Sequence, residues 1–167
     1  EKSTELKQMW RNRVISDTYE PGSTFKIVTA TAALEEKVAE MDRANDFSCA
    51  GSLKVGTWNI KCWRYYKPHG SESLRQGIMN SCNPVFMEVS QRIGIDKYCE
   101  YLSAFNLYSK TGIDLPGEAS GIMHDQKSMT AVDLATTSFG QTIQISTLQT
   151  AVNYCAVANG GYLIQPY

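Results

Sequence analysis

The residues with the clearest chemical potential are a serine and a lysine three positions apart, Ser23 and Lys26. They open a segment, residues 23–37, whose apolar side chains recur at helical spacing, so the sequence predicts a helix there. Residues three apart on a helix lie on one face, which places the hydroxyl beside the amine. A serine that attacks a carbonyl needs a base within hydrogen-bond reach, and a desolvated lysine can serve. The pair predicts nucleophilic catalysis, although Ser-x-x-Lys alone is a common pattern.

The surrounding residues make the pattern far more specific. Residues 17–26 end in Pro-Gly-Ser-Thr-Phe-Lys, which resembles the nucleophile segment of penicillin-binding proteins. Ser81-Cys82-Asn83 is similar to the second motif of that family, Ser-x-Asn. Residues 112–118 and 139–141, followed by 147–149, resemble stretches of the class B (monofunctional) enzymes, and most of all the sporulation-specific type. The resemblance covers nearly the whole chain.

The resemblance assigns a role to each motif residue. It implies that Ser23 is the acylated nucleophile and Lys26 its general base, that Ser81 relays a proton to the leaving amine, and that Asn83 hydrogen-bonds the substrate's amide. Simpler interpretations stay open for two of them. Asn83, which precedes Pro84, can be a helix cap without any catalytic role. Ser81 can be an ordinary loop hydroxyl.

The resemblance also implies a reaction and its partners. Ser23 would attack the penultimate D-alanine carbonyl of a peptidoglycan stem peptide, expel the terminal D-alanine, and pass the acyl group to the amine of a neighbouring strand. β-Lactams would acylate the same serine, and no cofactor or metal is required. The whole protein would act on the extracytoplasmic side of the bacterial membrane, anchored by an N-terminal segment outside this chain. A β-lactam sensor domain and a non-catalytic scaffold are the alternatives.

The expected fold is mainly α with one small β-hairpin, the helical part of the α/β transpeptidase (β-lactamase-like) fold with its central sheet largely missing. Residues 1–167 are expected to be a partial domain without the C-terminal strands that carry the third motif, Lys-Thr-Gly, so the chain alone is expected to be inactive. Lys110-Thr111-Gly112 spells that motif, but a loop-like sequence follows it, and we interpret it as a coincidence. The uncovered apolar face could drive homo-oligomerisation.

Local patterns predict the individual elements. Residues 47–63 read as a hairpin with a turn at 55–56, which would place Cys49 opposite Cys62, and residues 64–72 read as loop. No regular element is expected in the first fifteen residues, whereas 162–167 could begin a strand.

Helices are expected in the second half of the chain. One should follow the cap at Asn83 and stop at Gly94, and the next should open at Asp96. Capping boxes at Thr130 and Ser146 predict two more, the last ending at residues 160–161.

Five cysteines and two histidines form no spacing typical of a zinc site, so the sequence predicts no metal centre. His69 and His124 are expected in loops. Most cysteines should be small buried residues. Because Cys82 lies inside the second motif, a disulfide with Cys62 would make activity sensitive to redox state, and Cys49–Cys62 is a competing pair.

Composition excludes some classes of function. The net charge is −1, 43% of the residues are hydrophobic and no long basic run occurs, so nucleic acid is not an expected partner. The sequence contains no apolar stretch of the roughly 18 residues that a membrane helix needs.

Overall fold

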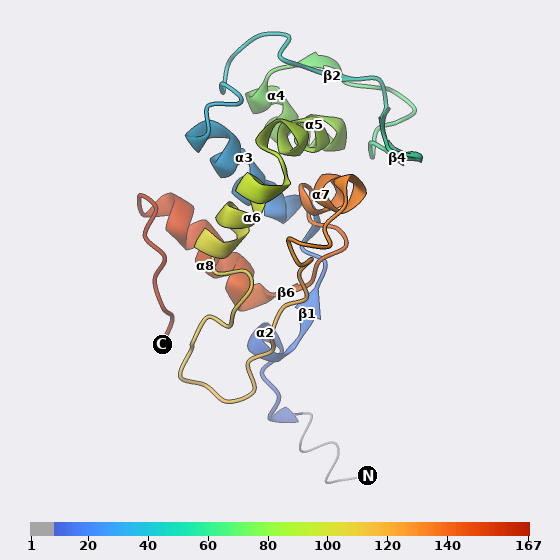
Figure 1. Cartoon of the computed structure of the whole chain (residues 1–167). Helices are drawn as coiled ribbons and strands as arrows, with labels where there is room; N and C mark the ends of the chain where they lie inside the picture. The colour runs from blue at the N-terminus through green and yellow to red at the C-terminus, as the bar shows by residue number, and fades with distance from the viewer. Residues whose placement is uncertain (1–8) are drawn as a thin grey trace.

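A computed structural model describes residues 9–167, and its helices gather around a central helix, α3 (Figure 1). The helices are α2 (Arg13–Ser16), the 3₁₀ turn η1 (Gly22–Phe25), α3 (Lys26–Glu35), α4 (Leu74–Met79), α5 (Asn83–Ile93), α6 (Ile95–Ala104), α7 (Ala131–Thr137) and α8 (Thr147–Ala158). The strands are β1 (Thr18–Tyr19), β2 (Phe47–Cys49), β3 (Ser52–Val55), β4 (Trp58–Lys61), β5 (Gly70–Glu72) and β6 (Ile145–Ser146). None of the helices in this part of the chain is long and apolar enough to cross a membrane.

Helix α3 can occupy the centre because its side chains are small. Ala32 and Ala33 are fully buried, and α5, α6 and α8 all pack on this helix. The buried hydroxyl of Thr29 lies 2.7 Å from the Tyr98 hydroxyl of α6 and donates to the Ser138 carbonyl, 2.8 Å away, just after α7. These bonds satisfy a polar group that would be costly to bury unpaired, and they fix α3 relative to two neighbours.

Helix α5 is buried over most of its surface because it lies between α3 and α7. Val85, Phe86, Met87 and Val89 are fully buried. The predicted stop at Gly94 is confirmed. The helix begins at Asn83 and Cys82 is its N-cap, so the predicted cap is wrong by one position.

The strands form three separate antiparallel pairs, β1–β6, β2–β5 and β3–β4. The mainly helical prediction is confirmed, but the expectation of a single hairpin undercounts the ladders, and residues 70–72 are a strand and not loop. Within residues 9–167 no sheet exceeds two strands.

The loop of the β3–β4 hairpin lies one residue later than predicted, which shifts the partner of each strand residue by two positions. Val55 pairs with Trp58, so the two-residue loop is Gly56-Thr57. Gly56 has a φ of +58°, a value that a tight hairpin loop requires at its first position and that glycine adopts without strain. Cys49 belongs to β2 and pairs with Gly70, so it does not face Cys62 across a ladder.

Expectations for the chain ends and caps had mixed outcomes. Residues 1–8 lie outside the described part, but residues 13–16 form a helix that was not expected. Residues 162–167 form no strand. The capping box at Thr130 is complete. At Ser146 only the serine half is present, because the Gln149 side chain bonds instead to backbone carbonyls of residues 106 and 109.

The backbone at Gly22, the residue before Ser23, contacts the segment that follows α7. The Gly22 amide donates to the Gly140 carbonyl over 2.8 Å, beside the β1–β6 ladder. Gly140 has a φ of +79°, and a Cβ added to it would lie 2.1 Å from the Gly22 carbonyl oxygen. Only glycine therefore allows the segment after α7 to approach the turn that carries Ser23.

We predict that Gly140→Ala destabilises the protein by about 1–3 kcal/mol more than Gly160→Ala. Both substitutions place alanine at positive φ, but nothing lies within 4 Å of a Cβ at Gly160. Urea denaturation of the two variants measures the difference. Equal losses of stability would show that the Gly22–Gly140 contact tolerates a side chain.

Candidate active site

Ser23 lies in the first turn of η1, directly before α3. The predicted helix over 23–37 is thus divided, with a 3₁₀ turn carrying the serine and an α-helix beginning at Lys26. Amide groups in the first turn of a helix have no partner within the helix. They carry the positive end of the helix dipole, which favours negative charge near Ser23.

Lys26 links the two predicted motifs. Its side chain is buried, and its Nζ donates to Ser23 Oγ at 3.2 Å, Ser81 Oγ at 2.9 Å, the Ser81 carbonyl at 2.8 Å and Asn83 Oδ1 at 2.8 Å. An ammonium group has three hydrogens, so four acceptors share them. The structure brings all four predicted residues together around one nitrogen.

Burial lowers the pKa of Lys26 from 10.5 to about 8. Desolvation is the main cause, and the nearby Cys82 and Cys62 thiols oppose it. The Nζ also lies 5.2 Å from the centre of the Phe86 ring, so part of its surroundings is apolar. A lysine with this pKa is partly neutral in mildly alkaline solution and can accept a proton.

Ser81 adopts a strained backbone. Its φ is +50°, in the left-handed region. The Ser81 amide donates to the Ile78 carbonyl at 3.1 Å and the Cys82 amide donates to Gly77 at 2.9 Å, which together form a Schellman motif at the end of α4. Glycine usually occupies this position, so serine here costs about 1–2 kcal/mol. The turn directs the Ser81 hydroxyl to Ser23 Oγ, 2.7 Å away.

Asn83 and Ser81 both point into the site. The Asn83 side chain accepts from Lys26 and makes no capping bond, and the Ser81 hydroxyl contacts both Ser23 and Lys26. Neither the helix-cap nor the loop-hydroxyl interpretation describes these contacts.

Comparison with known proteins agrees with this geometry. The family model described as "Penicillin binding protein transpeptidase domain" matches residues 1–167. This chain belongs to the penicillin-binding protein transpeptidase family. The expected family resemblance is therefore confirmed.

Relatives of this transpeptidase chain include named cell-wall proteins. It is 40% identical over 157 residues to stage V sporulation protein D of Bacillus subtilis, an alignment that covers 94% of this chain and 24% of that protein. It is 32% identical to the peptidoglycan D,D-transpeptidase PbpA of Mycobacterium tuberculosis, covering 93% of this chain and 32% of PbpA.

Solved structures give the same result. Penicillin binding protein 3 of M. tuberculosis, complexed with aztreonam, superposes with a TM-score of 0.85 at 29% identity. The match covers 93% of this chain and 34% of that structure. The transpeptidase chain thus spans about a quarter to a third of the length of these relatives.

A hollow of about 250 Å³ opens beside Ser23. Ser23, Lys26 and Ser81 form its polar side, and Ile27 and Tyr154 lie on its wall. The Tyr154 hydroxyl donates to the Thr24 carbonyl at 3.0 Å. The sequence analysis did not identify Tyr154 as a residue of the site. Its position in the helix that begins at residue 147 is the only sequence feature that could have drawn attention to it.

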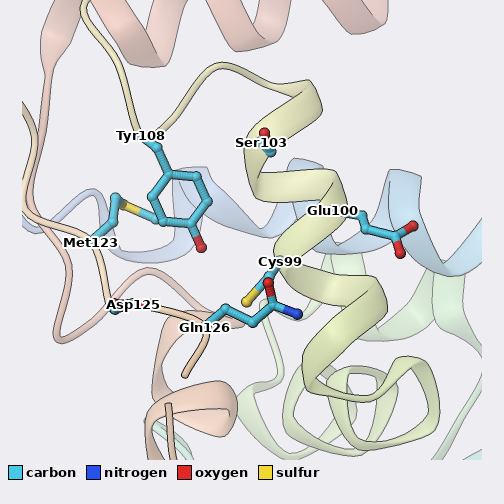
Figure 2. Close-up of a pocket in the computed structure, with 7 residues that line it drawn as sticks. All are labelled: Cys99, Glu100, Ser103, Tyr108, Met123, Asp125 and Gln126. Atoms are coloured by element: carbon cyan, nitrogen blue, oxygen red, sulfur yellow. The ribbon is translucent and has the colours of Figure 1, made fainter. Parts of the chain in front are cut away.

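A larger hollow, of about 530 Å³, lies elsewhere in the transpeptidase chain (Figure 2). It is bordered by Cys99 of α6 and by Tyr108 and Met123 of the following loop, and it contains none of the four motif residues. A choice of site by cavity volume alone would therefore miss the hollow beside Ser23.

Lys110-Thr111-Gly112 lies in a loop. This position is consistent with the interpretation that its match to the third motif is a coincidence. The Thr111 hydroxyl and amide both donate to Glu118 at 2.6 Å. None of the three residues borders the hollow at Ser23.

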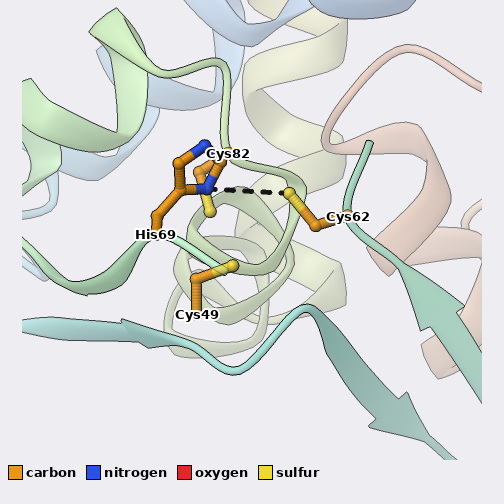
Figure 3. Close-up of side chains that lie close together, drawn as sticks. All are labelled: Cys49, Cys62, His69 and Cys82. Carbon is orange, nitrogen blue, oxygen red and sulfur yellow. Dashed lines mark hydrogen bonds between the residues drawn. The ribbon is translucent and has the colours of Figure 1, made fainter. Parts of the chain in front are cut away.

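Three cysteines and a histidine lie together beneath the second motif of the transpeptidase. Cys49, Cys62 and Cys82 are buried free thiols, and His69, although in a loop, has its ring buried among them (Figure 3). Burial raises the pKa of the Cys82 thiol, and Glu72 adds to this effect. The disulfides Cys62–Cys82 and Cys49–Cys62 stay predictions.

The remaining sulfur and imidazole groups lie outside this cluster. Cys99 is buried and Cys155 is exposed, so four of the five cysteines are buried, as expected. His124 lies in a loop, as expected, with its Nε2 3.0 Å from the Thr142 hydroxyl.

We predict that Ser81→Gly is more stable than Ser81→Ala by about 1 kcal/mol, because glycine adopts the left-handed backbone without strain. Both variants lose the hydroxyl that contacts Ser23. Chemical denaturation checks the order of stability, and labelling by a fluorescent penicillin should be impaired alike in both. An alanine variant as stable as the glycine variant would contradict the proposed strain.

Proposed function

We propose that the protein is a serine D,D-transpeptidase that cross-links peptidoglycan stem peptides through an acyl-enzyme on Ser23. The observation that carries the proposal is the position of the buried Lys26 amine, 3.2 Å from Ser23 Oγ and 2.9 Å from Ser81 Oγ. A nucleophile, its base and a second hydroxyl are thereby within proton-transfer distance.

Acylation begins at Ser23. Neutral Lys26 accepts the Ser23 hydroxyl proton while Oγ forms a bond to the carbonyl carbon of the penultimate D-alanine. Negative charge develops on the carbonyl oxygen, where first-turn amide groups of η1 and the helix dipole favour it. The apolar surroundings strengthen this stabilisation because little water competes.

Release of the terminal D-alanine requires a proton on its nitrogen. Ser81 Oγ lies 2.9 Å from Lys26 Nζ and 2.7 Å from Ser23 Oγ. The hydroxyl can give its proton to the leaving amine and take one from the Lys26 ammonium. The C–N bond then breaks, and the acyl group stays on Ser23 as an ester.

Transfer reverses these steps with a different amine. The amine of a neighbouring stem peptide attacks the ester, its proton passes to Lys26, and Ser23 leaves with a proton. We propose that Asn83, oriented by its 2.8 Å bond from Lys26, binds the substrate's peptide amide. A β-lactam would acylate Ser23 in the same way, but its leaving nitrogen would stay tethered.

The names of relatives support the proposed activity. PbpA is named a peptidoglycan D,D-transpeptidase. A second M. tuberculosis relative, penicillin binding protein 3, is complexed with aztreonam in one structure and with ampicillin in another. Because this chain spans a minor part of each, stem-peptide cross-linking, an extracytoplasmic location and a membrane anchor are proposals for a whole protein. We propose that its third motif and the strand completing the oxyanion hole also lie outside this chain.

We predict that a form extended past Tyr167 to include the third motif forms a covalent adduct with a fluorescent penicillin. Intact mass should show one adduct, absent from Ser23→Ala and retained in Ser103→Ala, a matched control in the larger hollow. The 167-residue chain should react about a hundred- to a thousandfold more slowly, the typical effect of one missing oxyanion-hole donor. An extended form that stays unlabelled would refute the proposed activity.

We predict that the second-order rate constant of this acylation rises with pH and levels off above about 8, the pKa of Lys26. The sign follows because Lys26 must be neutral to accept the proton, and the neutral fraction increases as pH rises through the pKa. Stopped-flow labelling across pH measures the profile. A rate that is constant over about two units on either side of pH 8 would argue against Lys26 as base.

A further inference from the structure

Four separate segments bring potential metal ligands to one point. Cys49 ends β2, Cys62 follows β4, His69 precedes β5 and Cys82 caps α5. One ligand atom from each residue lies within 4.8 Å of all the others (Figure 3). The nearest two in sequence, Cys62 and His69, are 7 residues apart, a wider spacing than zinc motifs use, so the sequence predicted no metal centre.

The distances suit a tetrahedral ion. Ligands bound at about 2.0–2.3 Å to one zinc ion lie about 3.5–3.8 Å from one another. Cys62 Sγ and His69 Nδ1 already lie 3.7 Å apart. No separation between ligand atoms in the cluster exceeds 4.8 Å, so closure around an ion needs shifts of about 1 Å or less, which side-chain rotation can supply.

The cluster also contains polar atoms that lack a partner. Glu72 is 1% exposed, and its Oε2 has no hydrogen-bond partner among the described residues although it lies only 3.9 Å from His69 Nδ1. Its other oxygen accepts from Asn80 at 2.7 Å, which fixes the carboxylate. A polar atom buried without a hydrogen-bond partner is costly, and the described residues supply no partner to this oxygen.

We propose that Cys49, Cys62, Cys82 and His69 bind one zinc ion. Three thiolates and one imidazole form a ligand set typical of structural zinc, and four protein ligands leave no open coordination position. Glu72 would lie beside the ion, because its Oε2 is 3.9 Å from the Nδ1 atom of His69. This proposal does not depend on the proposed transpeptidase activity.

The ion would hold the second motif in place. Cys82 lies between Ser81 and Asn83, so a metal bond to its sulfur would anchor the strained turn that directs Ser81 toward Ser23. Trp63 supports the same turn, because its indole donates to the Asn80 carbonyl at 3.0 Å and its ring centre lies 5.8 Å from that of His69. Zinc is thus expected to rigidify the residues around Ser81.

The first test is metal uptake by the reduced, chelator-treated protein. We expect one equivalent of zinc by elemental analysis, a higher melting temperature on binding, and release of protons from the thiols. Cobalt(II) should bind at the same stoichiometry and show the visible bands of a tetrahedral ion together with thiolate charge-transfer bands. Reduced protein that takes up neither metal would overturn the proposal.

Matched variants locate the site. Cys49→Ser and His69→Gln should each weaken binding at least about 100-fold, the upper range for changes around a metal site. Cys99→Ser, another buried cysteine but outside the cluster, should bind as the unmodified protein does. Circular dichroism of each metal-free variant checks folding. Binding that is equal in Cys49→Ser and Cys99→Ser would refute the assigned ligands, whatever the outcome of penicillin labelling.

Discussion

The architecture of the site depends on one buried nitrogen. Lys26 Nζ is held among oxygen atoms of Ser23, Ser81 and Asn83, and this places the start of α3 against the turn between α4 and α5. Burying an amine is costly, and the hydrogen bonds recover only part of the lost hydration, which is why its pKa falls to about 8. The same desolvation that opposes the charge makes the amine a usable base.

The partner of that nitrogen carries backbone strain. Ser81 adopts a left-handed backbone at a position where glycine is usual, and its neighbour Cys82 is fully buried in the cysteine–histidine cluster. Sites that need a side chain in an unusual direction commonly carry such a cost. The surrounding contacts, including the cluster beneath the turn, must supply the compensating stability.

The turn that carries Ser23 is also held by segments distant in sequence. Gly140 contacts Gly22 through backbone atoms alone, and Thr29 joins α3 to α6 and to Ser138. The contacts with Gly140 and Ser138 join this region to segments more than a hundred positions later in the chain. The geometry around Ser23 is therefore a property of the packed helices and not of the Ser-x-x-Lys turn alone.

The sequence by itself determined what local rules control. Helical spacing, Gly94 and the Thr130 box marked helices because propensity and capping act within a few residues. The resemblance of longer segments to family motifs, and not the common Ser-x-x-Lys spacing alone, pointed to Ser23, Lys26, Ser81 and Asn83. Only the tertiary structure decided which distant segments pair, which residues line the hollow and which side chains cluster.

Ladder β2–β5, the wall residue Tyr154 and the cluster around His69 join segments that lie apart in the chain, and no local pattern records such pairings. The hairpin register was missed for a related reason. Moving the loop by one residue shifts the partners by two positions and keeps each side chain on the same face, so alternation does not distinguish the two registers, and the backbone angle of Gly56 selects the loop.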